Sequence, residues 1–189
     1  AAAVLQRVSA GDVAAEPGRI VYTQWLNARA GIEADVTVTR LDETRFLVLS
    51  GPATLGRDRE WLERHIGPDE FATVTDISQA LAMIPVMGPN ARRLLQSITD
   101  ADLSAEAFPF GASREIDLGC GFVRATRITY VGELGFELYL ELLDEAVAFT
   151  TARVLEHGDR LAPAYRIDGG ELPAESTLDL PGYPGGTAV

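Results

Sequence analysis

A carboxylate interrupts an otherwise strand-like run in the second half of the chain. Glu133 lies in "YVGELGFELYL", with a glycine directly before it and another two residues after it. Such glycines let the backbone bend and expose the side chain, while the apolar neighbours anchor that bend in a sheet. A partly desolvated carboxylate there can accept two parallel hydrogen bonds from a planar pair of N–H donors. An ion pair with Arg124 or Arg127 and plain exposure in a turn are the alternatives.

A second carboxylate begins a strand-like segment. Asp35 follows the glycine-containing "ARAGIEA" and opens "ADVTVTRL". Alternation places Asp35, Thr37 and Thr39 on one face of the expected strand, so this polar face is either solvated or lines a site. Turn or cap chemistry is the alternative role for Asp35. Taken alone, Tyr22 and Tyr130 are typical half-buried strand residues whose hydroxyl groups need a polar partner.

The sequence lacks the residues that several other common catalytic mechanisms require. The 16 basic side chains are all arginine, which excludes a Schiff-base or P-loop lysine and leaves guanidinium groups to bind an anionic substrate. The single cysteine, Cys120, has no nearby histidine to activate it. His65 and His157 each lie near a glycine at an expected helix C-terminus, which favours a capping role. We therefore expect no transition-metal site.

Composition narrows the classes of partner. The net charge of −12 disfavours nucleic acid and anionic membrane surfaces, which would be repelled at long range. No apolar run approaches the roughly 20 residues needed to cross a bilayer, and no secretory signal is evident. A soluble protein in a reducing, cytoplasmic compartment is therefore expected. The chain does not begin with methionine, which suggests a part of a longer product.

Strands and helices occur in clusters, with a hairpin and without regular β-α alternation. This arrangement favours an α+β fold with mainly antiparallel sheets over a doubly wound fold. A single domain is expected over 1–165, followed by an irregular Pro/Gly-rich tail over 166–189. Helices are expected at 1–8, 52–67, 88–98 and 143–158, and strands at 18–27, 34–41, 45–50, 70–78, 80–87, 113–119, 122–130 and 135–142.

Four motifs, in order, carry a resemblance to a known family. They are "GRIVYTQWLNARAGIEADVTVTR", "MGPNARRLLQ", "DLSAEAFPFG" and "RITYVGELGFELYL". Together they resemble the glycine-cleavage T-protein (aminomethyltransferase) family, and most closely the tetrahydrofolate-binding region of dimethylglycine and sarcosine dehydrogenases. The resemblance covers residues 1 to about 165. It implies an α+β fold with ferredoxin-like parts and a central folate pocket.

The resemblance also implies roles for individual residues. Glu133 matches the position whose carboxylate binds the pterin, because the pterin amino group and the adjacent ring N–H form a planar donor pair. Asp35 matches the acid near N5 and N10 of the folate, where it can steer a proton and stabilise an iminium-like cation. Tyr22 matches a tyrosine of the folate pocket. Tyr130 and Arg127 are further candidates from the same motif as Glu133.

The resemblance weakens toward the C-terminus. Only "AYRIDGG" (164–170) is similar to the family segment whose arginine holds the folate tail. The barrel domain that follows this segment in the family has no counterpart here. The folate-binding domain is therefore expected to be incomplete at both ends. The implied function is one-carbon transfer from an aminomethyl or iminium donor to tetrahydrofolate, giving 5,10-methylenetetrahydrofolate, with an oxidase, dehydrogenase or lipoyl protein as partner. The alternative is a non-catalytic folate-binding or partner-interaction module.

Overall fold

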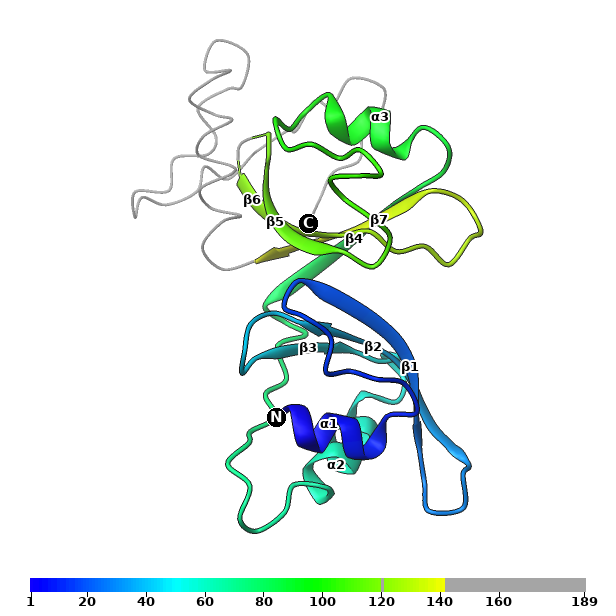
Figure 1. Cartoon of the computed structure of the whole chain (residues 1–189), viewed down its shortest axis with the longest axis vertical. Coiled ribbons are helices and arrows are strands. Elements are labelled where there is room, and N and C mark those ends of the chain that lie inside the picture. Colours follow the sequence, from blue (N-terminus) through cyan, green and yellow to red (C-terminus); the bar gives the residue numbers. More distant parts are fainter. Residues whose placement is uncertain (120, 142–189) are drawn as a thin grey trace, which may run out of the picture.

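Two antiparallel sheets form the framework of the protein (Figure 1). The computed structural model describes residues 1–119 and 121–141. The first sheet has three strands in the order β1-β2-β3, and the second has four in the order β4-β7-β6-β5. Within the described residues, no helix is long and apolar enough to cross a membrane. The expected α+β class with mainly antiparallel sheets is confirmed.

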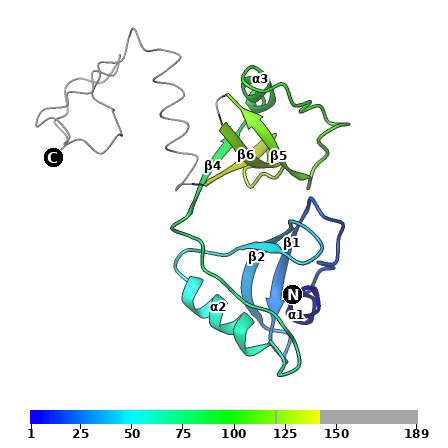
Figure 2. The same cartoon turned by 90° about the vertical axis from the view of Figure 1, so that its left-hand side faces the viewer.

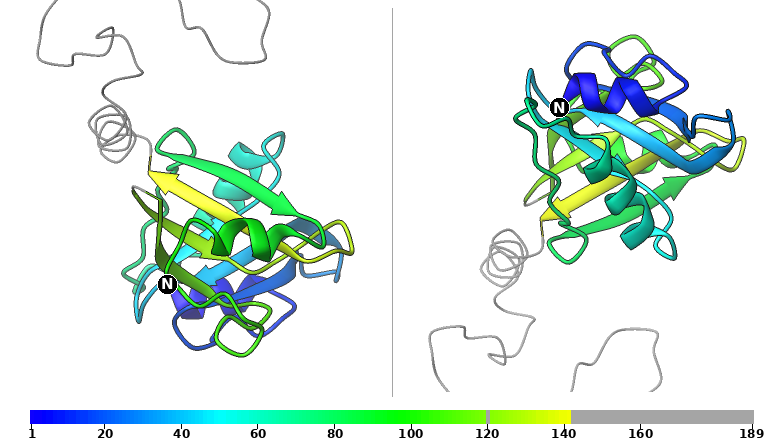
Figure 3. Two further views of the ribbon diagram at one scale, coloured as in Figure 1. Left: turned by 90° about the horizontal axis from the view of Figure 1, so that it is seen from above. Right: turned by 90° about the horizontal axis from the view of Figure 1, so that it is seen from below.

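The first sheet packs its outer face against two helices (Figure 3). Register pairs Trp25 with Ala34, and alternation places Val36 and Val38 on the same face, where all four side chains are buried. This apolar face forms one core with the helices. The elements are α1 (Ala2–Val8), β1 (Arg19–Leu26), β2 (Ile32–Arg40), β3 (Phe46–Leu49) and α2 (Leu55–Arg64).

The inner face of the first sheet is covered by the second sheet. Thr37 and Thr39 point away from the helices, yet they are only 3% and 1% exposed, and Ile20 beside them is also buried. Backbone hydrogen bonds join the two sheets at one edge, from Ile20 N to Gly111 O at 2.9 Å and from Ser113 N to Gly18 O at 2.7 Å. The polar face expected from the sequence is therefore mostly buried, and it is exposed only toward Asp35.

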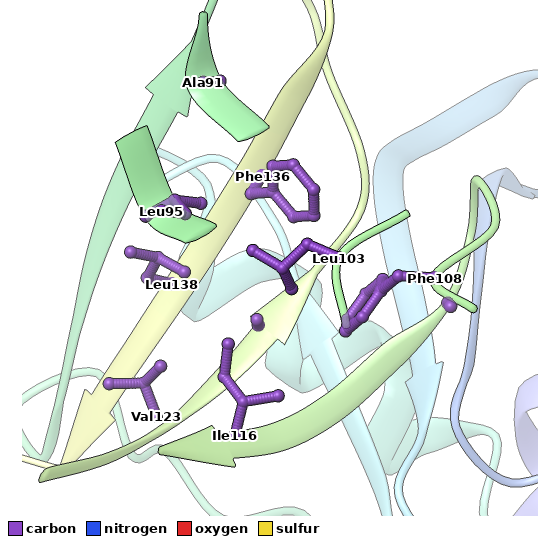
Figure 4. Close-up of a cluster of buried hydrophobic side chains, with 10 residues drawn as sticks. Ala91, Leu95, Leu103, Phe108, Ile116, Val123, Phe136 and Leu138 are labelled. Atoms are coloured by element: carbon purple, nitrogen blue, oxygen red, sulfur yellow. The ribbon is translucent and has the colours of Figure 1, made fainter. Parts of the chain in front are cut away.

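The second sheet has its own core, on the side away from the first sheet (Figure 4). Phe136 and Leu138 of β7 point into this core, where Phe136 meets Phe108 edge to face with ring centroids 5.8 Å apart. Alternation along β7 therefore turns Glu137 and Tyr139 toward the first sheet. The elements are β4 (Leu81–Met87), α3 (Ala91–Gln96), β5 (Ser113–Leu118), β6 (Gly121–Thr126) and β7 (Gly135–Glu141).

One expected strand is wrong and another is too long. Residues 70–78 belong to the irregular segment that connects the two sheets (Figure 2). Ala72 and Val74 pack against the first core, which explains the alternating pattern, but the backbone there pairs with no described strand. The strand expected over 122–130 ends at Thr126 and gives way to a loop. The helix expected at 143–158, the tail at 166–189 and Cys120 lie outside the described residues.

Candidate functional site

Three of the residues singled out from the sequence meet at one edge of the contact between the two sheets. Tyr22 and Asp35 lie on neighbouring strands of the first sheet, and the Tyr22 hydroxyl donates a hydrogen bond to Asp35 Oδ2 at 2.7 Å. Tyr130 comes from the loop before β7, and its ring meets that of Tyr22 edge to face, with centroids 6.4 Å apart. Two exposed aromatic rings and a carboxylate thus lie together where the sheets open to solvent.

Asp35 is held at both of its oxygen atoms. Gln24 lies directly opposite it on β1 and donates from Nε2 to Asp35 Oδ1 at 2.9 Å. The hydrogen bond to Asp35 is the main cause of a raised pKa for the Tyr22 hydroxyl. Tyr22 therefore serves here as a neutral donor to an exposed carboxylate.

Tyr130 links this network to the second sheet. Burial raises the pKa of Tyr130 to about 12, with a further contribution from the charge of Glu137. Tyr130 as a residue is 61% exposed, and Thr37 and Glu137 are among the polar groups that influence the pKa of its hydroxyl. The Thr37 hydroxyl is itself buried and has no hydrogen-bond partner among the described residues.

Glu137 is a site residue that the sequence analysis missed. It is 3% exposed, faces the first sheet, and forms no ion pair with any described residue. The Tyr139 hydroxyl donates to Glu137 Oε2, and burial followed by this hydrogen bond raises the pKa of Tyr139. A buried carboxylate that lacks a cationic partner is costly unless a ligand supplies donors. In the sequence, Glu137 is marked only by being a charged residue between the apolar Phe136 and Leu138 of an expected strand.

Glu133 lies in the loop between β6 and β7, and its side chain is exposed. Gly132 has φ +72°, which confirms the expected glycine-dependent bend. Gly135 has a different role: a Cβ atom there would overlap Met87 Sδ and would lie 2.8 Å from Ile128 O. The ion pairs considered for Glu133 are not found in the described part of the chain, where Arg124 pairs with Glu115 instead.

Arg127 does not join the other candidates. Its Nη1 donates to Phe108 O at 2.6 Å, which ties it to the core of the second sheet. Burial lowers the pKa of Arg127, and the nearby charge of Arg92 lowers it further. The structure therefore gives Arg127 a role in holding the loop that carries Tyr130. It places no group of three metal-ligating side chains together within residues 1–119 and 121–141.

The side chains of the site offer aromatic faces and hydrogen-bond acceptors. The edge of the site supplies two phenol rings, and an aromatic face can stack on a heterocycle. Two carboxylates, one exposed and one buried, supply acceptors for N–H donors. Such a set can bind and orient an uncharged or cationic heterocycle, and Asp35 can accept a proton from it.

Comparison with known proteins identifies the family of the chain. Residues 1–162 match the model of the GCVT N-terminal domain. The chain is 42% identical over 136 residues to a 4-methylaminobutanoate oxidase (formaldehyde-forming) of Paenarthrobacter nicotinovorans, covering 72% of this chain and 16% of that protein. It is 38% identical over 144 residues to human mitochondrial sarcosine dehydrogenase, covering 68% of this chain and 16% of the relative.

A solved structure also matches. The glycine cleavage system aminomethyltransferase T from Bartonella henselae superposes with a TM-score of 0.61 at 28% identity, over 84% of this chain and 41% of that one. The chain thus spans less than half of this neighbour and about one sixth of the oxidase and the sarcosine dehydrogenase. The family model covers most of the sequence, and the chain belongs to the glycine-cleavage T-protein (GCVT N-terminal domain) family.

Proposed function

We propose that this chain binds tetrahydrofolate where its two sheets meet and presents it for one-carbon transfer. The observation that carries the proposal is the convergence of Tyr22, Asp35, Tyr130 and Glu137 from both sheets on one place. Family membership supports folate-dependent one-carbon chemistry in general. The particular site residues, donor and product are our proposal.

Two carboxylates are candidates for binding the pterin amino group and its neighbouring ring N–H. Glu133 is the proposal from the sequence motif, but its side chain is exposed and would be desolvated only when the ligand covers it. Glu137 is already buried, and Tyr139 orients it. A preorganised carboxylate loses little freedom on binding, so the geometry favours Glu137. Glu133 remains the competing proposal.

Asp35 is proposed to act at the reacting nitrogen atoms. N5 of tetrahydrofolate attacks the carbon of an iminium donor, N10 closes the ring, and the departing amine carries away both protons as its ammonium ion. Asp35 can relay the N5 proton and stabilise the cation that forms on the way. Its exposed position at the edge of the sheets, next to the Tyr22 ring, leaves it accessible to the ligand.

The donor is proposed to be a small amine-derived one-carbon unit, and the product 5,10-methylenetetrahydrofolate. The names of the relatives support this class, since they include a sarcosine dehydrogenase and an aminomethyltransferase. An oxidase, a dehydrogenase or a lipoyl protein would deliver the unit. The alternative is a folate-binding or partner-interaction module without turnover, which is favoured by the short span of the chain relative to those proteins.

Ligand-induced stabilisation tests the binding step. Tetrahydrofolate at 100 times its dissociation constant should stabilise the chain by about 2.7 kcal/mol, seen as a higher melting temperature. Absence of any shift would contradict folate binding and favour the interaction module.

A transfer assay then separates an enzyme from a binder. With formaldehyde or a demethylating partner as the donor, the wild-type chain should form methylenetetrahydrofolate. Asp35→Asn should lower turnover by about 100-fold while changing folate affinity much less, because general acid-base groups act mainly on the rate. Binding without transfer by the wild-type chain would identify a folate-binding module.

A further inference from the structure

The carboxylate of Asp35 is fixed in its plane by two side chains of one strand. Tyr22 and Gln24 are two residues apart on β1, so they project from the same face of the sheet. Gln24 lies directly opposite Asp35, whereas Tyr22 reaches it diagonally. The two donors bind different oxygen atoms, at 2.7 Å for Oδ2 and 2.9 Å for Oδ1.

This arrangement restricts the terminal torsion of the Asp35 side chain. The terminal torsion of an aspartate is broad and roughly two-fold, so an exposed carboxylate held at one oxygen can still rotate about that contact. A second donor on the other oxygen removes this freedom. Each oxygen has two lone pairs, so one on each remains for a ligand, pointing in a direction that β1 determines.

We propose that Gln24 is a positioning residue that aims the free lone pairs of Asp35 at the nitrogen atoms between which the one-carbon unit is carried. The inference rests on the proposed function of the site. Gln24 acts through Asp35, because its amide donates to the carboxylate and its side chain is only half-buried at the edge of the sheets. Tyr22 shares the task but also offers its ring to the ligand, which makes Gln24 the cleaner position for a test.

Selectivity for a cationic folate gives a readout that does not require turnover. In 5,10-methenyltetrahydrofolate the N5–N10 bridge is a cation, whereas 5-formyltetrahydrofolate is neutral at these atoms and has the same pterin and tail. An aimed Asp35 carboxylate should favour the cation. The ratio of the two dissociation constants, measured at pH 6 with the whole chain, therefore reports the orientation of Asp35.

Gln24→Met keeps the length of the side chain and removes the donor. We expect it to lower the preference for the cation by about three- to ten-fold while leaving the affinity for 5-formyltetrahydrofolate nearly unchanged. Asp35→Asn should lower the preference further. Gln79→Met, at an exposed glutamine of the segment that connects the sheets, is the matched control and should behave as wild type.

The possible outcomes are distinct. If wild type prefers the cation and Asp35→Asn loses that preference while Gln24→Met keeps it, the positioning role of Gln24 is wrong. A loss of affinity for both ligands by Gln24→Met, with an unchanged ratio, would also overturn it, because that pattern indicates a structural role only. If the wild-type chain binds neither folate, the proposed function itself fails.

Discussion

Glu133 and Glu137 lie four residues apart in one motif, yet they occupy opposite environments. Glu133 is exposed in a loop opened by Gly132, and Glu137 is 3% exposed between two sheets with Tyr139 as its donor. The first was conspicuous in the sequence because glycines surround it. The second is buried, which makes it costly without donors and supports the ligand-binding role that we propose for it. Local backbone signals therefore locate the motif, but tertiary packing decides which of its acids is preorganised.

Removal of the hydrogen-bond donor to the buried acid should have the largest effect on stability. Tyr139→Phe leaves Glu137 Oε2 without its partner inside the protein. We expect the free energy of unfolding to fall by about 1–3 kcal/mol, because a buried acceptor then stays unsatisfied. Urea denaturation monitored by circular dichroism measures this change. A stability equal to that of wild type would show that Glu137 is more hydrated than the structure indicates.

The two glycines that flank Glu133, Gly132 and Gly135, differ in what a larger side chain would meet. Gly135→Ala should destabilise the fold by about 1–3 kcal/mol, because the added Cβ would meet Met87 Sδ and the backbone oxygen of Ile128. Gly132→Ala has free space but must keep φ +72°, so its cost should be about 1 kcal/mol. The same denaturation series ranks the two variants, and the reverse order would contradict the packing described for Gly135.

Alkaline titration should separate Tyr130 from an ordinary tyrosine. Its pKa is raised to about 12 from an ordinary value of about 10, so the fold favours the neutral phenol. The stabilising contribution is complete below about pH 10 and is lost as the pH rises through about 12. Phenolate absorbance should show a late-ionising group that is absent in Tyr130→Phe. Identical titration curves for the two proteins would place the Tyr130 hydroxyl in solvent.

Much of the fold follows from the sequence because the cores are built from regular patterns. Alternation in β1 and β2, and helical spacing in α2 and α3, identify elements that the structure contains. In α3, Ala91 and Leu95 are buried, whereas Leu94 is exposed. The strand expected over 70–78 is wrong for a physical reason: Ala72 and Val74 alternate against a core, while the backbone there pairs with no strand of the described residues.

The site was only partly predictable. Tyr22, Asp35 and Tyr130 are candidates from the sequence, and the structure brings them together. Glu137 was missed because alternation assigns a residue to a face of its strand but cannot say that another sheet covers that face. Thr37 illustrates the same limit, since alternation leaves open whether its side chain is solvated or lines a site, and its 3% exposure excludes only the first.

We propose that a buried carboxylate between the two sheets binds the pterin of tetrahydrofolate. Calorimetric titration of tetrahydrofolate into wild type, Glu137→Gln and Glu133→Gln measures the contribution of each acid. We predict that Glu137→Gln loses about 2–4 kcal/mol of binding free energy, because charge-assisted hydrogen bonds are replaced by an amide with one acceptor, while Glu133→Gln changes affinity less than about three-fold. Full affinity in Glu137→Gln together with lost binding in Glu133→Gln would contradict the account and assign the pterin to the exposed loop.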